Sequence, residues 1–358
     1  MEAYLAIEGG EVVEARGRVP GTTNGELVFT TAYTGYEESL TDPSYAEQVL
    51  TFSYPLIGNY GVREDRFESD RVQPEAVVAR ELTDDVVEWL AEADTPAIDH
   101  LDTRDVVTDV REEGAMRCGI AVGEDVTPAD ARAELEACIP MSDHTDIGAS
   151  VSVEEPEVYG ADADGATVAL VDCGAKRSIV DSLVERGATV HVLPYDATPA
   201  DVDAVDPDLL FVSNGPGDPA TVDDAIALVE AYVDELPIAG ICLGQQIVAE
   251  ALGGSTEKMA FGHRGVNQPV MDLRTEQVVM TTQNHGYSVA EPGDVLEVTQ
   301  VNVNDDTPEG LDSEEHDVIT RQYHPEAHPG PHDSLSFFDD VLAMTGVEST
   351  SSPAPADD

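Results

Sequence analysis

Short apolar runs alternate with amphipathic segments through the second half of the chain. The runs are rich in Val, Ile and Leu, as expected for buried strands, and each is followed by apolar positions at helical spacing. The pattern predicts strands at 167–172, 188–193, 208–214 and 237–242, with helices at 177–186, 199–205, 221–235 and 244–252. Strands that alternate with helices form a parallel sheet with right-handed crossovers, and ligands bind at the carboxyl ends of its strands.

The first half of the chain has a different pattern. It predicts strands at 4–7, 26–31 and 48–53 and helices at 83–91 and 103–113. Residues 151–165 are acidic, contain Pro and Gly, and show little periodicity, which is typical of a linker. We therefore expect an α/β protein with a mixed α/β domain at 1–150, the linker, a parallel-sheet domain at 166–347 and a flexible tail at 348–358.

The net charge of the chain limits what its surface can bind and the medium in which it can fold. The chain has 73 acidic and 17 basic residues and a formal charge of −56, which argues against binding to nucleic acid or to anionic membranes. Because the acids are spread along the whole sequence, self-repulsion would be severe in dilute salt. It would be largely screened at about 1 M salt, so we expect a salt-rich cytoplasm, as in a halophile. No signal peptide and no membrane-spanning run is predicted.

Four cysteines are too few and too scattered for a disulfide framework, and no Cys-x-x-Cys pair indicates a metal. We expect no metal site. One cysteine, however, lies in the sequence Gly240-Ile241-Cys242-Leu243-Gly244, where a predicted strand gives way to a helix. A sharp turn there exposes the side chain at a helix N-terminus, which favours a thiolate, and leaves the N–H of Leu243 available to an oxyanion. On its own the motif fits a buried core cysteine equally well.

A second motif favours catalysis. His324 follows a predicted strand, and Glu326 stands two residues later in His-Pro-Glu. A thiol nucleophile requires an imidazole to move its proton, and the imidazole requires a carboxylate to fix its tautomer. Together with the cysteine turn, the motif predicts a catalytic triad of Cys242, His324 and Glu326. His328 and His332 are interpreted as surface or structural residues.

These motifs resemble a known family. Cys242-Leu-Gly-Gln-Gln246 together with His324-Pro-Glu326 is similar to the class I, triad-type glutamine amidotransferases. The loop Asn214-Gly-Pro-Gly-Asp-Pro219 is similar to the glycine-rich loop of that family.

The first domain narrows the resemblance. Thr34-Gly-Tyr-Glu-Glu38, the run Leu40–Tyr45, the run Tyr54–Gly61 and Asp102-Thr-Arg104 resemble the amino-terminal domain of the carbamoyl-phosphate synthase small-subunit family. Gly174-Ala-Lys-Arg177 and Gln283-Asn-His-Gly-Tyr287 match the same family. The resemblance covers about residues 1–345.

The resemblance also implies which residues contact glutamine. By matching position these are Ser44, Gly215, Gly217, Leu243, Gln246, Asn284, Gly286 and Tyr287, with Lys176 adjacent to the site. Ser44 comes from the first domain. Two departures, Gln245 where His is frequent and Tyr287 where Phe is common, imply tuning of the activity and no loss of it.

The implied activity is hydrolysis of L-glutamine to glutamate and ammonia through a thioester. The implied partner is a large synthetase subunit that uses the ammonia, bicarbonate and ATP to make carbamoyl phosphate for arginine and pyrimidine synthesis. This chain has no P-loop motif, so ATP and Mg²⁺ are expected on the large subunit and no cofactor here. Two alternatives stay open: a catalytically silent regulatory or scaffold subunit, and an amidotransferase serving a different synthetase.

Overall fold

The chain folds into two compact units. The computed structural model describes residues 1–145 and 147–347. Unit 1 comprises residues 1–144 together with 259–265, and unit 2 comprises 145–258 together with the chain from 266 onward. Within the expected linker lie the end of helix α5 (Ile147–Val151) and strand β10 (Glu157–Tyr159). The expected tail, 348–358, lies outside the described residues.

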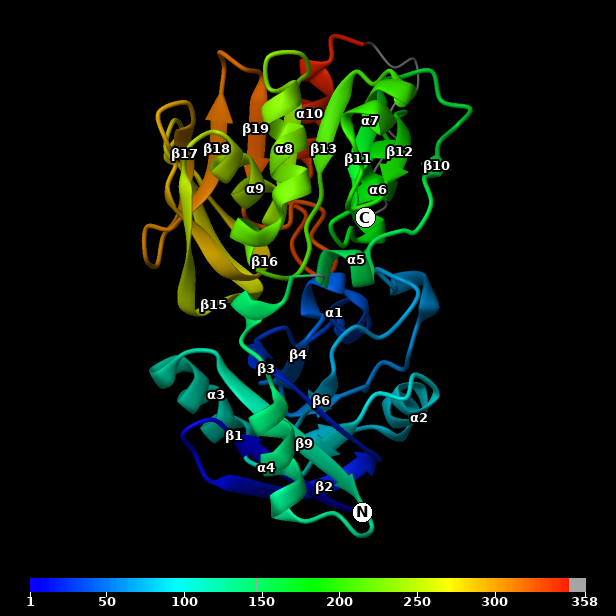
Figure 1. The fold of residues 1–358 in the computed structure, drawn as a ribbon, viewed down its shortest axis with the longest axis vertical. Helices are drawn as coiled ribbons and strands as arrows, with labels where there is room; N and C mark the ends of the chain where they lie inside the picture. Colours follow the sequence, from blue (N-terminus) through cyan, green and yellow to red (C-terminus); the bar gives the residue numbers. More distant parts are fainter. Residues whose placement is uncertain (146, 348–358) are drawn as a thin grey trace. The chain divides into compact units, whose positions relative to one another are not determined.

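Unit 1 is built on a closed barrel, shown in blue to cyan in Figure 1. The order around the barrel is β1-β2-β8-β6-β4-β3-β9, and a separate pair is formed by β5 and β7. The bounds are β1 Glu2–Ile7, β2 Val12–Val19, β3 Gly21–Thr30, β4 Gln48–Phe52, β5 Leu56–Ile57, β6 Ala76–Val78, β7 Glu81–Leu82, β8 Ala97–Asp99 and β9 Met116–Gly123.

Successive residues of these strands point into two different cores, because side chains alternate across a strand. Leu27 and Phe29 pack with helix α3 (Thr103–Glu113), whereas Val28 packs with α1 (Tyr36–Thr41) and α2 (Asp84–Glu92). Helix α4 (Pro128–Ala137) approaches β9 so closely that a methyl group at Gly119 would lie 2.3 Å from the carbonyl oxygen of Ala131. The short 3-10 turns of this unit are η1 Pro43–Tyr45, η2 Glu64–Arg66 and η3 Met141–Asp143.

Unit 2 is built on a mixed sheet in the order β10-β12-β11-β13-β14-β19-β18-β17-β15-β16. The run from β12 to β19 is parallel, and β18, β17 and β15 continue it antiparallel. The bounds are β11 Thr167–Val171, β12 Thr189–Leu193, β13 Leu209–Val212, β14 Ile238–Ile241, β15 Ser255–Asp272, β16 Val278–Glu291, β17 Glu297–Asn302, β18 Pro308–Ser313 and β19 Val318–Arg321.

Helices cover both faces of the parallel part of this sheet (Figure 1). Residues of α7, α8 and α9 pack with β11, β13 and β14 in one core, and residues of α6 and α10 form the core on the other face. The bounds are α6 Arg177–Val184, α7 Pro199–Val205, η4 Pro219–Thr221, α8 Asp223–Tyr232, α9 Leu243–Ala251 and α10 Ser336–Met344. None of the helices in the described part of the chain is long and apolar enough to cross a bilayer.

The α/β fold class predicted from the sequence is confirmed. Every strand and helix expected between 167 and 252 is present, with ends shifted by at most three residues. The antiparallel strands after α9 were not predicted, because no segment with apolar residues at helical spacing separates them.

Candidate active site

Cys242 lies on a strained turn between β14 and α9. Its backbone has φ 56° and ψ −106°, a combination that few residues other than Gly adopt. The turn is held by a hydrogen bond of 2.7 Å from the N–H of Cys242 to the carbonyl oxygen of Arg321, at the end of the neighbouring strand β19. The predicted sharp turn is therefore present, but the expected exposure of the side chain is wrong, because Cys242 is only 2% exposed.

The two glycines of the motif are required by close packing. A methyl group at Gly244 would lie 2.1 Å from the carbonyl oxygen of Val212, and one at Gly240 would lie 2.7 Å from the carbonyl carbon of Gly244. Real side chains do not approach that closely, so strand and helix can meet here only without a Cβ atom.

His324 and Glu326 follow β19, the strand that lies beside β14. The ring Nδ1 of His324 is 2.6 Å from Glu326 Oε1, and the N–H of His324 donates to the carbonyl oxygen of Thr282 at 2.8 Å. The thiol of Cys242 donates to the carbonyl oxygen of Asn284 at 3.6 Å. Because Nδ1 is occupied by the carboxylate, Nε2 is the ring nitrogen left for the cysteine.

Lys176 joins this group from the N-terminus of α6. Its Nζ donates to Glu326 Oε1 at 2.9 Å and to the carbonyl oxygen of His328 at 2.7 Å. The side chains of Lys176, His324 and Glu326 are all at most 2% exposed. Lys176, which was expected only to lie adjacent to the site, thus donates a hydrogen bond to the Glu326 carboxylate that holds His324.

The charges of this buried group act on one another: Glu326 favours the protonated form of His324, and Lys176 opposes it. Burial by itself lowers the pKa of His324, but the Glu326 carboxylate and the Cys242 side chain outweigh it and raise that pKa to about 10. Burial raises the pKa of Glu326, yet Lys176 and His324 hold it well below its usual range. The carboxylate is therefore ionised, and its charge favours a proton on the imidazole.

The other three cysteines differ from Cys242. All four are free thiols. Burial raises the pKa values of Cys118, Cys138 and Cys173, so these thiols stay protonated. Cys118 lies within β9, Cys138 follows α4, and Cys173 lies in the loop between β11 and α6 and not at the first residue before a helix.

Gly215, an expected glutamine contact, and Leu243, the expected oxyanion donor, are neighbours. A methyl group at Gly215 would lie 3.0 Å from Leu243 Cδ2 and only 1.9 Å from the carbonyl oxygen of Cys173, so the position admits glycine alone. Leu243 is the first residue of α9, where backbone N–H groups have no partner inside the helix. Gly217, two residues along the same loop, has φ 99°.

The remaining expected glutamine contacts of unit 2 lie on α9 and β16. Gln246 donates through Nε2 to the carbonyl oxygen of Tyr287 at 2.7 Å and to Gln322 Oε1 at 3.0 Å. Asn284 and Tyr287 are buried, and Gly286 between them is half-buried. Ser44 belongs to unit 1, where it is buried in η1 and its N–H donates to Asp42 Oδ1 at 2.9 Å.

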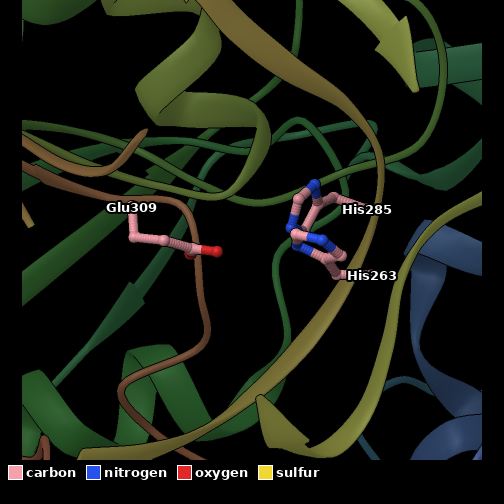
Figure 2. Close-up of side chains that lie close together, drawn as sticks. All are labelled: His263, His285 and Glu309. Atoms are coloured by element: carbon pink, nitrogen blue, oxygen red, sulfur yellow. The ribbon is translucent and has the colours of Figure 1, made fainter. Parts of the chain in front are cut away.

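His285, within the same segment of β16, is held by hydrogen bonds at both ring nitrogens. Its Nδ1 is 2.8 Å from the carbonyl oxygen of Tyr287 and its Nε2 is 2.9 Å from Gln283 Oε1. Figure 2 shows this ring together with the side chain of Glu309, whose Oε1 accepts from Asn302 Nδ2 at 3.0 Å. Since both ring nitrogens are bonded to neighbouring residues of β16, His285 fixes the shape of this segment. His263, labelled in the same view, belongs to unit 1.

Sequence reasoning missed the backbone anchors of the site. The carbonyl oxygens of Thr282, Asn284 and Arg321 hold His324 or Cys242 in place. A carbonyl group is common to every residue, so no side-chain motif could have identified these three. The expected surface position of His328 and His332 agrees with their exposed side chains.

Comparison with known families identifies the class of protein. The family model "Glutamine amidotransferase class-I" matches residues 169–344, which include the Cys242 turn and the His324 segment. Unit 2 is therefore a class I glutamine amidotransferase domain.

Comparison of the whole chain identifies the family more narrowly. The model "Carbamoyl-phosphate synthase small chain, CPSase domain" matches residues 5–120. Carbamoyl phosphate synthase small chains of Halobacterium salinarum and Methanocaldococcus jannaschii are 69% and 42% identical, over 99% and 96% of this chain and 99% of each relative. The chain belongs to the carbamoyl-phosphate synthase small-chain family. The similarity to the Halobacterium protein agrees with the halophile-like composition.

Proposed function

We propose that this chain hydrolyses L-glutamine to glutamate and ammonia with Cys242, His324 and Glu326, and supplies the ammonia to a large synthetase chain. The observation that carries the proposal is the buried group of these three residues at the carboxyl ends of β14 and β19. A thiol, an imidazole and a carboxylate in this order are the components of amide hydrolysis through a covalent intermediate.

In the first half of the reaction, the Cys242 thiol passes its proton to Nε2 of His324, and the resulting thiolate attacks the side-chain carbonyl carbon of glutamine. The carbonyl π electrons move to its oxygen, where the N–H groups of Gly215 and Leu243 stabilise the negative charge. The imidazolium formed on His324, which the Glu326 carboxylate stabilises, gives this proton to the leaving nitrogen. The C–N bond breaks, ammonia departs, and a γ-glutamyl thioester remains.

In the second half, water replaces ammonia. The neutral His324 takes a proton from water as its oxygen attacks the thioester carbon. Collapse of the second tetrahedral intermediate breaks the C–S bond and releases glutamate. Glu326 keeps Nδ1 of the ring occupied throughout, and Lys176 keeps Glu326 ionised. The other expected contacts of unit 2, Gly217, Gln246, Asn284, Gly286 and Tyr287, are proposed to bind the glutamine.

The names of the relatives support this choice of partner. Relatives that match over nearly their full length are named small chains of carbamoyl phosphate synthase. ATP and Mg²⁺ accordingly act on the large chain, which condenses the ammonia with bicarbonate. We place the reaction in the cytoplasm, where free thiols such as the four of this chain stay reduced.

Replacement of the nucleophile tests the function. Cys242→Ser is expected to abolish glutamate release and to leave ammonia-driven carbamoyl phosphate synthesis by the two-chain complex intact, since a serine hydroxyl is far less ionised than a thiol. Both rates are measured in molar KCl, with Cys138→Ser as the matched control. Retention of more than a few per cent of glutamate release in Cys242→Ser would contradict the assignment. A wild-type chain without glutaminase activity, alone or in complex, would favour a silent scaffold subunit.

A further inference from the structure

One face of the antiparallel strands of unit 2 carries a row of apolar side chains. Met271 of β15 pairs with Val301 of β17, and Val303 donates its N–H to the carbonyl oxygen of Pro269 at 2.9 Å. The hairpin between β15 and β16 closes with a bond of 3.0 Å from the N–H of Asp272 to the oxygen of Gln277. Because the two strands are antiparallel and Asp272 lies opposite Gln277, Val278 lies opposite Met271 and Met280 lies opposite Pro269.

We call this row the hairpin face. It consists of Pro269, Met271, Val278, Met280, Val301 and Val303. Val278, Met280 and Val303 are 51%, 41% and 48% exposed, and the other three side chains are half-buried. Contiguous exposed apolar side chains across three strands, unlike scattered single ones, are typical of a protein–protein interface.

The segments that form this face also lack acidic residues. In the whole chain 73 of 358 residues are acidic, which is one residue in five. The stretches 266–271, 277–290 and 298–304 contain no acidic residue in 27 positions, where about five would be expected at that frequency. Acids reappear at the turns, at Asp272 and Glu276 and at Asp305 and Asp306. The face is thus an uncharged apolar centre with a charged rim, the composition expected of an interface.

Electrostatics limits what can bind this chain. A partner adapted to the same salt-rich medium is itself acidic, and like charges brought together across an interface cost several kcal/mol. An acidic partner can therefore approach closely only where this chain has no carboxylates, and the hairpin face fulfils that condition.

The hairpin face is continuous with the catalytic group. From Val278 and Met280, β16 runs directly into Thr282, whose carbonyl oxygen accepts from the N–H of His324, and into Asn284, whose carbonyl oxygen accepts from the Cys242 thiol. At about 3.3 Å per residue, Met280 is about 7 Å along the strand from Thr282. A chain seated on this face lies beside the source of ammonia.

We propose that the hairpin face is the docking surface for the large synthetase chain. This inference rests on the proposed function, because ammonia released into water is protonated and lost as a nucleophile, so its consumer must sit close to Cys242. A second copy of this chain consumes no ammonia and gains nothing from that position.

The test introduces charge into the face and measures assembly. The double variant Val278→Glu/Met280→Glu is compared with Val158→Glu, which adds a carboxylate at a 49% exposed valine on β10, at the opposite edge of the same sheet. Each full-length variant is titrated with the large chain of the same organism in molar KCl, and the Kd is measured by sedimentation. Melting curves establish that the variants are folded.

The double variant is expected to bind the large chain at least about thirty-fold more weakly, whereas Val158→Glu binds like the wild type. Equal binding by the wild type and the double variant overturns the proposal, and so does equal weakening by the double variant and Val158→Glu. Loss of self-association of the isolated chain, with unchanged binding to the large chain, assigns the face to a second copy and also overturns it. A wild-type chain that binds no large chain contradicts the proposed partner, an outcome distinct from failure of the face alone.

Discussion

Both units bury one carboxylate among cationic side chains, and the two groups work differently. Asp99 in the barrel is fully buried and lies 2.7 Å from Arg16 Nε and 2.7 Å from Arg18 Nη1. Glu326 in the sheet unit is equally buried and lies 2.6 Å from His324 and 2.9 Å from Lys176. Surrounding charges lower the pKa of each carboxyl group.

The partners make the difference. Arg16 is 45% exposed, and Arg18 also reaches Asp84 and the carbonyl oxygen of Leu82. Asp99 thus connects β2, β7 and β8 chiefly through guanidinium groups that never lose their proton, and the half-exposed ring of His100 is a further contact at 3.1 Å. His324, in contrast, is buried and can release its proton. A buried carboxylate held by permanent cations stabilises a fold, whereas one held by an imidazole controls a proton.

The largest expected effect is on activity, and it distinguishes the Glu326 group from the Asp99 group. His324→Asn should reduce glutamate release by about 10²–10⁴-fold, because the residue that moves the proton is gone. Ammonia-driven synthesis by the complex should be kept. His316→Asn, at a surface histidine paired with Asp234, is the matched control. Turnover of His324→Asn within a factor of three of the wild type would exclude His324 as the proton carrier.

Removal of the buried carboxylate in the barrel should affect stability alone. Asp99→Asn leaves two arginines without their buried partner and is expected to destabilise the protein by about 3 kcal/mol, the lower part of the range for a broken buried pair. Glutamate release per folded molecule should not change. Denaturant unfolding in molar salt measures the first quantity and a glutaminase assay the second. A tenfold fall in turnover would give Asp99 a role in the site.

Glu326→Gln should have an intermediate effect on the reaction. The amide oxygen can still accept from Nδ1 of His324, but the negative charge that favours the imidazolium is lost, and a thiol depends less on its base than a hydroxyl does. We expect glutamate release to fall about tenfold, less than in His324→Asn. Asp208→Asn, a carboxylate that caps the N–H of Thr167, serves as the control. Kinetics equal to the wild type would reduce the triad to a Cys–His pair.

The smallest effect concerns pH. The folded pKa of His324 lies near 10, above its ordinary 6.5, so its contribution to stability is complete below pH 6.5 and is lost as pH rises towards 10. The pKa of Asp99 is lowered, so its contribution is present above pH 3.8 and is lost only in acid. The difference in Tm between the wild type and His324→Asn should shrink by a few degrees from pH 6.5 to 10. The corresponding difference for Asp99→Asn should stay constant over that range, and two parallel curves would contradict this account.

The two groups were not equally predictable from the sequence. Cys242, His324 and Glu326 stand in motifs whose spacing carries chemical meaning, and the apolar runs around them indicate the parallel sheet. Asp99, Arg16 and Arg18 lie in segments with no such motif, because their meeting depends on how the barrel closes. The closure depends on pairings such as β2 with β8, between residues about 80 positions apart, which no local pattern records.

Lys176 lies between these cases. Its rarity, as one of two lysines in the chain, indicated a special position, but its bond to Glu326 could not be read from sequence because 150 residues separate the two. The hairpin face was missed for another reason. Alternation along β15 and β16 is visible only once the register of three antiparallel strands is known.

The pairing of β14 with β19 has a consequence for how this chain can be altered. The two strands run side by side from Ile238 and Val318 to Ile241 and Arg321, although the polypeptide between them passes through α9 and β15 to β18. The distance between the Cys242 sulfur and the His324 ring is thus set by the pairing of β14 with β19. The length of the chain that connects these two strands does not affect it. We therefore expect that loops such as 304–307 tolerate lengthening, or even cleavage into a two-piece enzyme, as long as β16 keeps Thr282 and Asn284 in place.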